Sequence, residues 1–332
     1  MSLREFVVLG TSSQVPTRHR NHNGYLLRWD GHGFLFDPGE GIQRQFIHAN
    51  TSVTCVTKIF ITHFHGDHCL GLAGIIQRLS LDRVPHPVEV YFPETGERYF
   101  HRLVNASIYV KNIKPIPVPV PLSGGVIKRE GNLRIEALPL KHAVDTVGYR
   151  IIEEDQTRFD PDKLKALGLR GPVVGVLQRA GKVEHEGRIV TLDEVSFQRR
   201  GAGFALIMDT RLTDNCFELA KGVDMLVCES TFLKPEEKLA RDYMHMTAEQ
   251  AGIVARDSGA RELVLTHFSQ RYANIKAFKR EARRHFDEVH AVRDLDRLPF
   301  ARPDEAVPEE PAPHAAQRDT DAVPNTPAEE DS

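Results

Sequence analysis

The 332-residue chain has few cysteines, no long apolar run and no recognisable leader segment. The cysteines have neither the spacing of a disulfide framework nor that of a CxxC zinc knuckle. No stretch approaches the roughly 18 apolar residues of a membrane span, and the N-terminus MSLREFVVLG has no small-residue cleavage site. We therefore expect a cytoplasmic protein that makes no membrane contact. The thiols, expected to be free and buried, are Cys55, Cys69, Cys216 and Cys228.

Large apolar residues are also nearly absent from the last 32 residues. Residues 301–332 contain nine Asp and Glu against two Arg, which gives a local charge of −7, and six of the 20 prolines. Such a segment cannot bury enough surface to offset its chain entropy, so we expect a disordered acidic tail. The whole chain has a charge of −3, which leaves residues 1–300 mildly basic and able to accept a polyanionic substrate.

Short apolar runs recur through residues 1–300, and several lead to a polar residue of possible chemical use. Those residues are His63, His142, Asp209, Glu229 and His267. Helical patterns alternate with the runs: an apolar stripe spans 70–79, the capping-box pair Thr247 and Gln250 begins another helix, and 275–286 is basic. The alternation indicates one α/β layered domain. The charged stretch at about 154–200 interrupts it and is expected to be an insertion.

The segment His63-Phe-His65-Gly-Asp67-His68 places three imidazoles and a carboxylate within six residues, directly after an apolar run. Imidazole nitrogen and carboxylate oxygen are suitable ligands for zinc, manganese or iron. Four ligand-type side chains in so short a loop can reach two metal centres. The segment therefore predicts a hydrolytic metal site, although a histidine-rich surface loop is the simpler alternative.

An HxHxDH motif after a buried strand resembles the metallo-β-lactamase superfamily. The resemblance implies a four-layer αβ/βα sandwich with the site at the edge of its strands. It also implies two metal ions, zinc with manganese as an alternative. The implied ligands are His63, His65 and His142 for one metal, Asp67, His68 and His267 for the other, and Asp209 as the bridge.

Further motifs resemble the ribonuclease Z family. They are Val8–Arg20, Phe36–Gln45, Cys228–Phe232, His245-Met-Thr247 and His267–Tyr272. The resemblance implies a homodimeric, zinc-dependent endoribonuclease of the short form. Such an enzyme cuts the 3′ trailer from precursor tRNA, leaving a 3′-hydroxyl on the tRNA and a 5′-phosphate on the trailer. The insertion at 154–200 corresponds in position to the flexible arm that grips the elbow of the tRNA.

Hydrolysis of a phosphodiester needs a proton for the leaving oxygen. His245 is a suitable general acid because imidazole titrates near neutral pH, and Glu229 would orient it. The resemblance adds Asp67 as a catalytic group as well as a ligand. Arginine suits bidentate contact with phosphate. The expected RNA-binding residues are Arg18, Arg20, Arg44, Arg170, Ser269 and Arg271.

Two other functions compete with this interpretation. One is a small-molecule phosphodiesterase or arylsulfatase-like hydrolase on the same fold, which the insertion and the motifs around Glu229 and His245 argue against. The other is a non-catalytic RNA-binding protein, which would have no reason to keep seven metal ligands. A cut in a 3′-extended precursor tRNA that a chelator abolishes would separate the three.

Overall fold

A computed structural model describes residues 3–300 of the chain. The acidic tail predicted at 301–332 lies outside the described residues. Within 3–300, no helix is long and apolar enough to cross a membrane.

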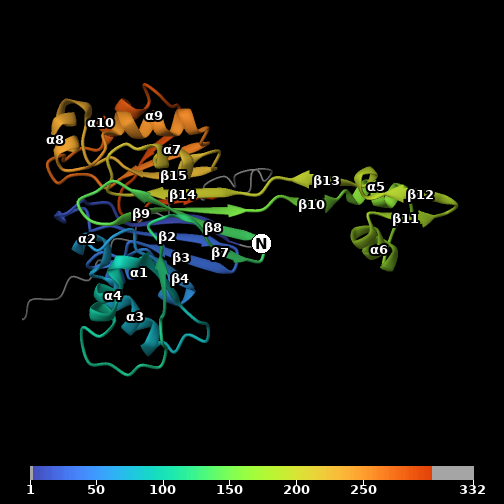
Figure 1. The fold of residues 1–332 in the computed structure, drawn as a ribbon, viewed down its shortest axis with the longest axis horizontal. Coiled ribbons are helices and arrows are strands. Elements are labelled where there is room, and N and C mark those ends of the chain that lie inside the picture. Colours follow the sequence, from blue (N-terminus) through green and yellow to red (C-terminus); the bar gives the residue numbers. More distant parts are fainter. Residues whose placement is uncertain (1–2, 301–332) are drawn as a thin grey trace, which may run out of the picture.

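Two seven-stranded sheets pack face to face (Figure 1). Each sheet is antiparallel on one side and parallel on the other. The order in the first sheet is β18 (Arg297–Pro299), β1 (Arg4–Gly10), β2 (Gly24–Trp29), β3 (His32–Phe36), β4 (Lys58–Phe60), β5 (Glu89–Pro93) and β6 (Ile116–Val120). The order in the second is β17 (Val289–Ala291), β16 (Glu262–Thr266), β15 (Met225–Glu229), β14 (Gly203–Ile207), β9 (Thr146–Glu153), β8 (Leu133–Leu140) and β7 (Gly125–Glu130).

Helices cover the outer face of each sheet (Figure 1). The first sheet carries α1 (Ile42–His48), α3 (Leu72–Leu81) and α4 (Glu97–Val104). The second carries α7 (Asp214–Ala220), α8 (Glu237–Asp242), α9 (Ala248–Ser258) and α10 (Lys276–Ala282). The four layers confirm the predicted αβ/βα sandwich. Thr247 caps α9 through the expected capping box with Gln250, whereas α10 is shorter than the predicted 275–286 because the chain turns after Ala282.

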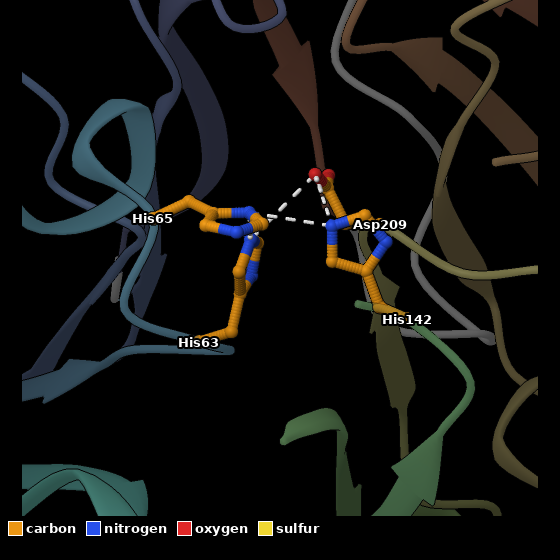
Figure 2. A group of neighbouring side chains, drawn as sticks. All are labelled: His63, His65, His142 and Asp209. Carbon is orange, nitrogen blue, oxygen red and sulfur yellow. Dashed lines mark hydrogen bonds and ion pairs between the residues drawn. The ribbon is translucent and has the colours of Figure 1, made fainter. Parts of the chain in front are cut away.

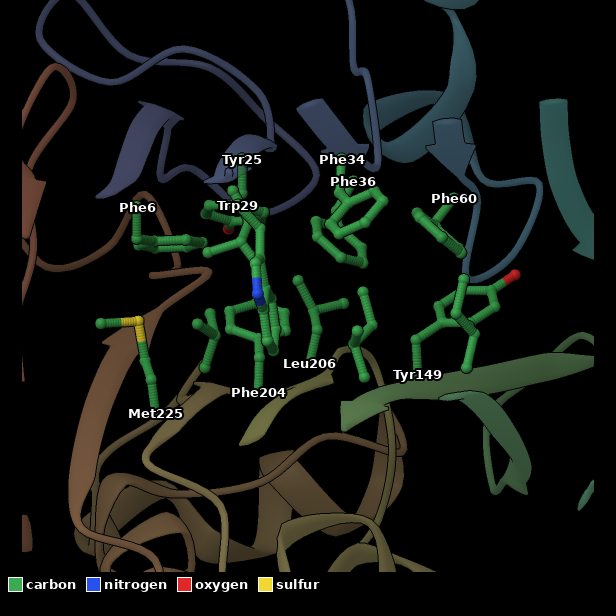
Figure 3. Close-up of a cluster of buried hydrophobic side chains, with 14 of the residues drawn as sticks. Phe6, Tyr25, Trp29, Phe34, Phe36, Phe60, Tyr149, Phe204, Leu206 and Met225 are labelled. Carbon is green, nitrogen blue, oxygen red and sulfur yellow. The ribbon is translucent and has the colours of Figure 1, made fainter. Parts of the chain in front are cut away.

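Aromatic side chains fill the space between the two sheets. Phe34, Phe36 and Phe60 from the first sheet meet Tyr149 and Phe204 from the second (Figure 3). The Phe36 and Phe204 ring centroids are 5.3 Å apart, and those of Phe60 and Tyr149 are 5.0 Å apart. Since large aromatic side chains bury much apolar surface, this layer holds the sheets at a fixed separation. It thereby fixes the relative positions of the loops at the sheet edges.

The segment between β9 and β14 projects from the sandwich as an arm, on the opposite end from α2 (Gly66–Cys69) (Figure 1). Its stalk is the antiparallel pair of β10 (Gln156–Phe159) and β13 (Ser196–Arg199). Its head comprises α5 (Pro161–Ala166), α6 (Pro172–Ala180), β11 (Lys182–His185) and β12 (Arg188–Thr191). The head has a small core of its own, around Leu169, Leu177, Val190 and Val195. The arm therefore packs independently of the sandwich.

Candidate metal centre

The ends of parallel strands bring the polar residues together. β3 and β4 run parallel and end near Asp37 and His63. β14, β15 and β16 also run parallel: β15 ends at Glu229, and β14 and β16 end within two residues of Asp209 and His267. In such sheets the carboxyl ends of the strands share one edge, where sites are commonly built.

Three of these residues turn the chain sharply after their strands. Asp37, Asp209 and His267 have φ angles of 43°, 37° and 61°. This left-handed backbone is uncommon for residues other than glycine and is concentrated at functional sites.

The first group of ligand-type side chains is His63, His65, His142 and Asp209. Figure 2 shows the two histidines of the 63–68 segment facing His142 and Asp209 across the site. His63 Nε2 lies 3.0 Å from His65 Nδ1, and His142 Nε2 lies 3.3 Å from His65 Nδ1. Asp209 Oδ2 lies 3.6 Å from the Nε2 atoms of both His63 and His142.

The second group is Asp67, His68 and His267. Asp67 Oδ2 lies 3.3 Å from His68 Nε2 and 3.6 Å from His267 Nε2. The other oxygen of Asp209, Oδ1, lies 3.3 Å from His68 Nε2 and 3.0 Å from His267 Nε2. The Asp209 carboxylate therefore lies between the two groups, with one oxygen directed at each.

Hydrogen bonds on the outer side fix the histidine rings. The Nδ1 atom of His68 donates to Asp37 Oδ2 at 2.8 Å, and that of His142 donates to the Met244 carbonyl at 3.1 Å. The His267 Nδ1 atom lies 2.7 Å from the Thr231 hydroxyl. A ring that donates through Nδ1 keeps the lone pair of Nε2 for a metal. The rings of His68 and His142 are therefore oriented as ligands.

Asp37 and Thr231 are contributions to the site that the sequence analysis missed. Besides its contact with His68, the fully buried Asp37 carboxylate accepts from the Thr62 amide and hydroxyl. The available signal was its place after the apolar run of β3, the same pattern that marked the ligands. Thr231 had no such signal, because its contacts with His245 and His267 join residues that are 14 and 36 positions apart in the chain.

The residues fit a metal centre. Asp209 Oδ1 and His267 Nε2 are buried and have no hydrogen-bond partner in the described part of the chain, although they lie within ion-pair distance of each other. Buried polar atoms without a partner are costly. Converging imidazole nitrogens and carboxylate oxygens are the donor set that zinc and similar divalent ions bind. A cation between these groups would satisfy both atoms.

The electrostatics of the cluster also favour a bound cation. Burial, helped by the neighbouring His68, holds the pKa of His63 well below its usual value, so this ring is neutral. Burial alone would raise the pKa of Asp67, but His68 and His267 outweigh it and lower that pKa. Neutral imidazole and ionised carboxylate are the protonation states that ligands require. Burial alone would lower the pKa of His68, but Asp209, Asp67 and Asp37 outweigh it and raise that pKa well above its usual value, so a metal ion would have to displace a proton from this ring.

Beside the ligands, His245 and Glu229 form a pair. His245 Nδ1 donates to Glu229 Oε1 at 2.9 Å. The fully buried Glu229 also accepts from the Thr210 amide and the Thr231 hydroxyl. Burial disfavours the charged form of His245, but the Glu229 and Asp209 carboxylates outweigh it and raise its pKa to about 9. His245 is therefore held as a proton donor at the edge of the cluster.

A cavity of about 580 Å³ opens over the cluster. His65, Asp67, His142 and His245 line it, and so do Ser269 and Arg271 among the predicted RNA-binding residues. The Arg271 guanidinium lies 5.3 Å from the Phe232 ring centroid. Asp209 lines the cavity too, whereas His63, His68, His267 and Glu229 are fully buried and do not. Part of the predicted metal site, His245 and two of the predicted RNA-binding residues therefore share one opening.

The other predicted RNA-binding residues lie outside this cavity. Arg18 lines an adjoining hollow. Arg20 lines the same hollow, but its guanidinium donates to the Ser269 and Tyr272 carbonyls at 3.1 and 3.0 Å, which ties two loops together. Arg44 is on α1, beside a separate hollow, and Arg170 is exposed on the arm between α5 and α6.

The four-layer sandwich and its two ligand groups define a hydrolase of the metallo-β-lactamase fold. Solved structures agree on the fold. The short form of human tRNase Z has a TM-score of 0.67 at 22% identity, covering 90% of this chain and 99% of that one. The metallo-β-lactamase fold protein YhfI from Bacillus subtilis has a TM-score of 0.64 at 17% identity, with the same coverage. A family model described as anti-Pycsar protein Apyc1 matches residues 4–114.

Relatives that are similar in sequence identify the family within this class. The Ribonuclease Z of Nocardia farcinica is 53% identical over 301 residues, covering 90% of this chain and 99% of the relative. That of Streptomyces coelicolor is 52% identical over 304 residues, covering 91% and 99%. That of Protochlamydia amoebophila is 46% identical over 302 residues, covering 91% and 98%. The chain therefore belongs to the ribonuclease Z family, as its motifs predicted.

Proposed function

We propose that this chain is a metal-dependent endoribonuclease that removes the 3′ trailer from precursor tRNA, leaving a 3′-hydroxyl on the tRNA and a 5′-phosphate on the trailer. The observation that carries the proposal is the group of six ligand-type side chains around Asp209, with the His245–Glu229 pair beside it, in a chain of this family. The small-molecule alternative is not favoured, because relatives over nine-tenths of the chain are named Ribonuclease Z.

We assign two zinc ions to the site, with manganese as an alternative that the same ligands accept. His63, His65 and His142 would hold one, Asp67, His68 and His267 the other, and Asp209 would contact both. When bound, such a pair lowers the pKa of a water molecule and neutralises charge on the phosphate being cleaved. The position of one Asp209 oxygen near each group supports the bridging assignment.

The protein's own side chains would carry out the proton transfers and make the contacts with the RNA. His245 would donate its Nε2 proton to the 3′ oxygen that leaves the phosphorus, while Glu229 holds the opposite side of the ring. Asp67 lines the cavity and would accept the proton of the attacking water in addition to its role as a ligand. Ser269 and Arg271 would contact the RNA end. Phosphate contacts that position the substrate are assigned to the remaining arginines, Arg18, Arg20, Arg44 and Arg170.

We further propose that the enzyme is a homodimer. Within one chain, β9 and β14 separate the stalk of the arm from the Asp209 end of the sheet. The arm therefore points away from the site of its own chain (Figure 1), and would be better placed to grip a tRNA cleaved at a partner's site. Ile47 on α1 and Leu81 on α3 are 67% and 74% exposed. These apolar side chains support an interface on that face, since exposed apolar surface often marks one.

Free thiols support a reducing compartment, so we propose a cytoplasmic location. None of the four cysteines forms a disulfide, and three are buried as expected, while Cys55 is half-buried.

Purified protein incubated with a precursor tRNA bearing a 3′ trailer tests the main proposal. We expect a single cut that leaves a 3′-hydroxyl on the tRNA, is lost with a chelator and returns on addition of zinc or manganese. Asp209→Ala is the matched negative control, because it removes the shared ligand. Turnover of a generic phosphodiester without any cut in the precursor would contradict the assigned substrate.

A further inference from the structure

A strongly basic surface lies on α10, away from the metal cluster. Five cations line one hollow of about 520 Å³, and we call them the α10 basic surface: Lys276, Lys279, Arg280, Arg283 and Arg284. Within residues 3–300, none of these side chains lies within ion-pair distance of a carboxylate. Elsewhere many cations are paired, as in Arg4 with Asp30 and Glu153.

The acid that α10 itself carries does not neutralise this surface. Glu281 is buried and turned inward, where its carboxylate accepts from the Lys234 and Glu249 amides. Glu249 is committed to Lys234 and His285. Like charges gathered in one hollow repel one another, so the α10 basic surface is suited to an acidic ligand.

This surface is continuous with the catalytic opening. Lys276 also lines the neighbouring hollow that contains Arg18 and Arg293, and Gln270 lines both that hollow and the cavity over the metal cluster. The acid in the connecting hollow is Asp294, whose carboxylate accepts from the Thr11 hydroxyl and the Asn21 amide. An anion on α10 would therefore occupy one end of a basic path that leads to the site.

The chain ends in an acidic segment, residues 301–332. The match to the Nocardia farcinica relative spans 99% of that protein but 90% of this chain, which leaves about 31 residues of this chain unmatched, close to the length of the segment. Four of its nine acids are clustered at Asp304, Glu305, Glu309 and Glu310. An acidic segment of charge −7 complements the α10 basic surface in sign and size.

The segment also begins close enough to reach this surface. β17, which packs against α10, ends at Ala291, and nine residues further on the described chain ends at Phe300, after β18. An extended chain covers at most about 3.3–3.6 Å per residue, so the end of the described chain is within about 33 Å of β17. A segment of 32 residues spans up to roughly 100 Å by the same measure, and tethering gives it an effective concentration on the order of millimolar.

We propose that the acidic segment 301–332 of this chain docks on the α10 basic surface and competes there with RNA for the path to the active site. Docking lowers RNA affinity at low salt and is displaced as salt rises or as a longer polyanion arrives. Ionic contacts of this kind are screened at high ionic strength.

Zero-length carbodiimide crosslinking of the full chain tests the docking without any RNA. In about 20 mM salt, where screening is weak, we expect amide links from Lys276 and Lys279 to acids of 301–332, and we expect 1 M salt to suppress them. A K276R/K279R variant keeps the charge but removes the amines, and should lose these links. Links that go mainly to arm lysines such as Lys163 and Lys165, or no tail links at all, would overturn the docking.

The competition with RNA rests on the proposed function and needs a separate measurement. We expect D304N/E305Q/E309Q/E310Q to bind precursor tRNA about three- to tenfold more tightly at low salt. This gain should disappear in a K279Q/R280Q/R283Q background, while K163Q/K165Q serves as the matched control that retains it. An equal gain in every background would overturn competition at α10. If no variant binds RNA although the crosslinks form, the proposed function fails and the docking stands.

Discussion

At one end of the sandwich, the seven predicted ligand side chains lie mostly buried within a few ångströms of one another, whereas at the other end the arm carries its cations in exposed positions. The predicted ligands follow strands of the two seven-stranded sheets. The arm is held by a two-stranded stalk and a core of its own. The function of the site therefore depends on the exact positions of its side chains, whereas the function of the arm depends on its length and its charge. Substitutions at the two ends should have separable effects.

The largest expected effect is at the site end. His245→Ala should lower kcat on precursor tRNA by about 10²–10⁴, the usual contribution of a general acid, without changing the bound metal. Bis(p-nitrophenyl) phosphate has a leaving group that needs no proton, so its turnover should be nearly unchanged. Metal analysis and the two rates check this together. Equal losses on both substrates would remove His245 as the acid.

Asp37→Ala should have the next largest effect. It removes the acceptor that orients His68, and loss of such a partner costs about 10–100-fold in metal affinity or activity. Unlike His245→Ala, Asp37→Ala should slow the turnover of both substrates, and added zinc should restore part of the rate. Titration with a competing chelator measures the affinity. Asp30→Ala, an acid remote from the cluster, is the control and should leave metal affinity unaltered.

Removal of the arm should affect the cleavage of precursor tRNA but not that of the small phosphodiester. Replacing 158–197 by an Asn-Gly turn keeps the first pairs of the β10–β13 stalk and suits a tight hairpin. We expect KM for precursor tRNA to rise on the order of tenfold, by loss of phosphate contacts, with unchanged turnover of bis(p-nitrophenyl) phosphate. If turnover of both substrates falls equally, the arm supports the fold of the site, and the comparison between the two ends fails.

The smallest effect on activity is expected at Asp294, which belongs to neither end and where the change concerns the free energy of unfolding. Burial raises the pKa of Asp294 to about 6, although the Asn21 amide and the Thr11 hydroxyl oppose this. Because the folded pKa lies above the unfolded value, the stability it contributes is complete below about pH 4 and is lost as pH rises through 6. The loss is up to about 3 kcal/mol. Urea unfolding of wild type and Asp294→Asn at pH 4.5 and 7 should show this difference; parallel profiles would contradict it.

The sequence alone predicted the layered fold. It also placed the predicted ligands at one edge of the sheets, because each follows an apolar run that was expected to form a buried strand. The family motifs added Glu229 and His245, which lie within hydrogen-bond distance. The orientation of the rings was beyond the sequence. It depends on Asp37 and Thr231, which meet their histidines across 31 and 36 residues. Nothing local in the sequence reveals that the Arg20 guanidinium, predicted to contact phosphate, also donates to two carbonyls of the 269–272 loop.

The predicted ligands come from both halves of the sandwich. His63, His65, Asp67 and His68 follow a strand of the first sheet, while His142, Asp209 and His267 follow strands of the second. A cation can thus bind fully only after the halves have docked, so metal uptake and folding are thermodynamically linked. At a free metal concentration 1,000 times Kd, this linkage adds about 4 kcal/mol to the free energy of unfolding. Metal supply would then set the lifetime of the folded chain as well as its activity.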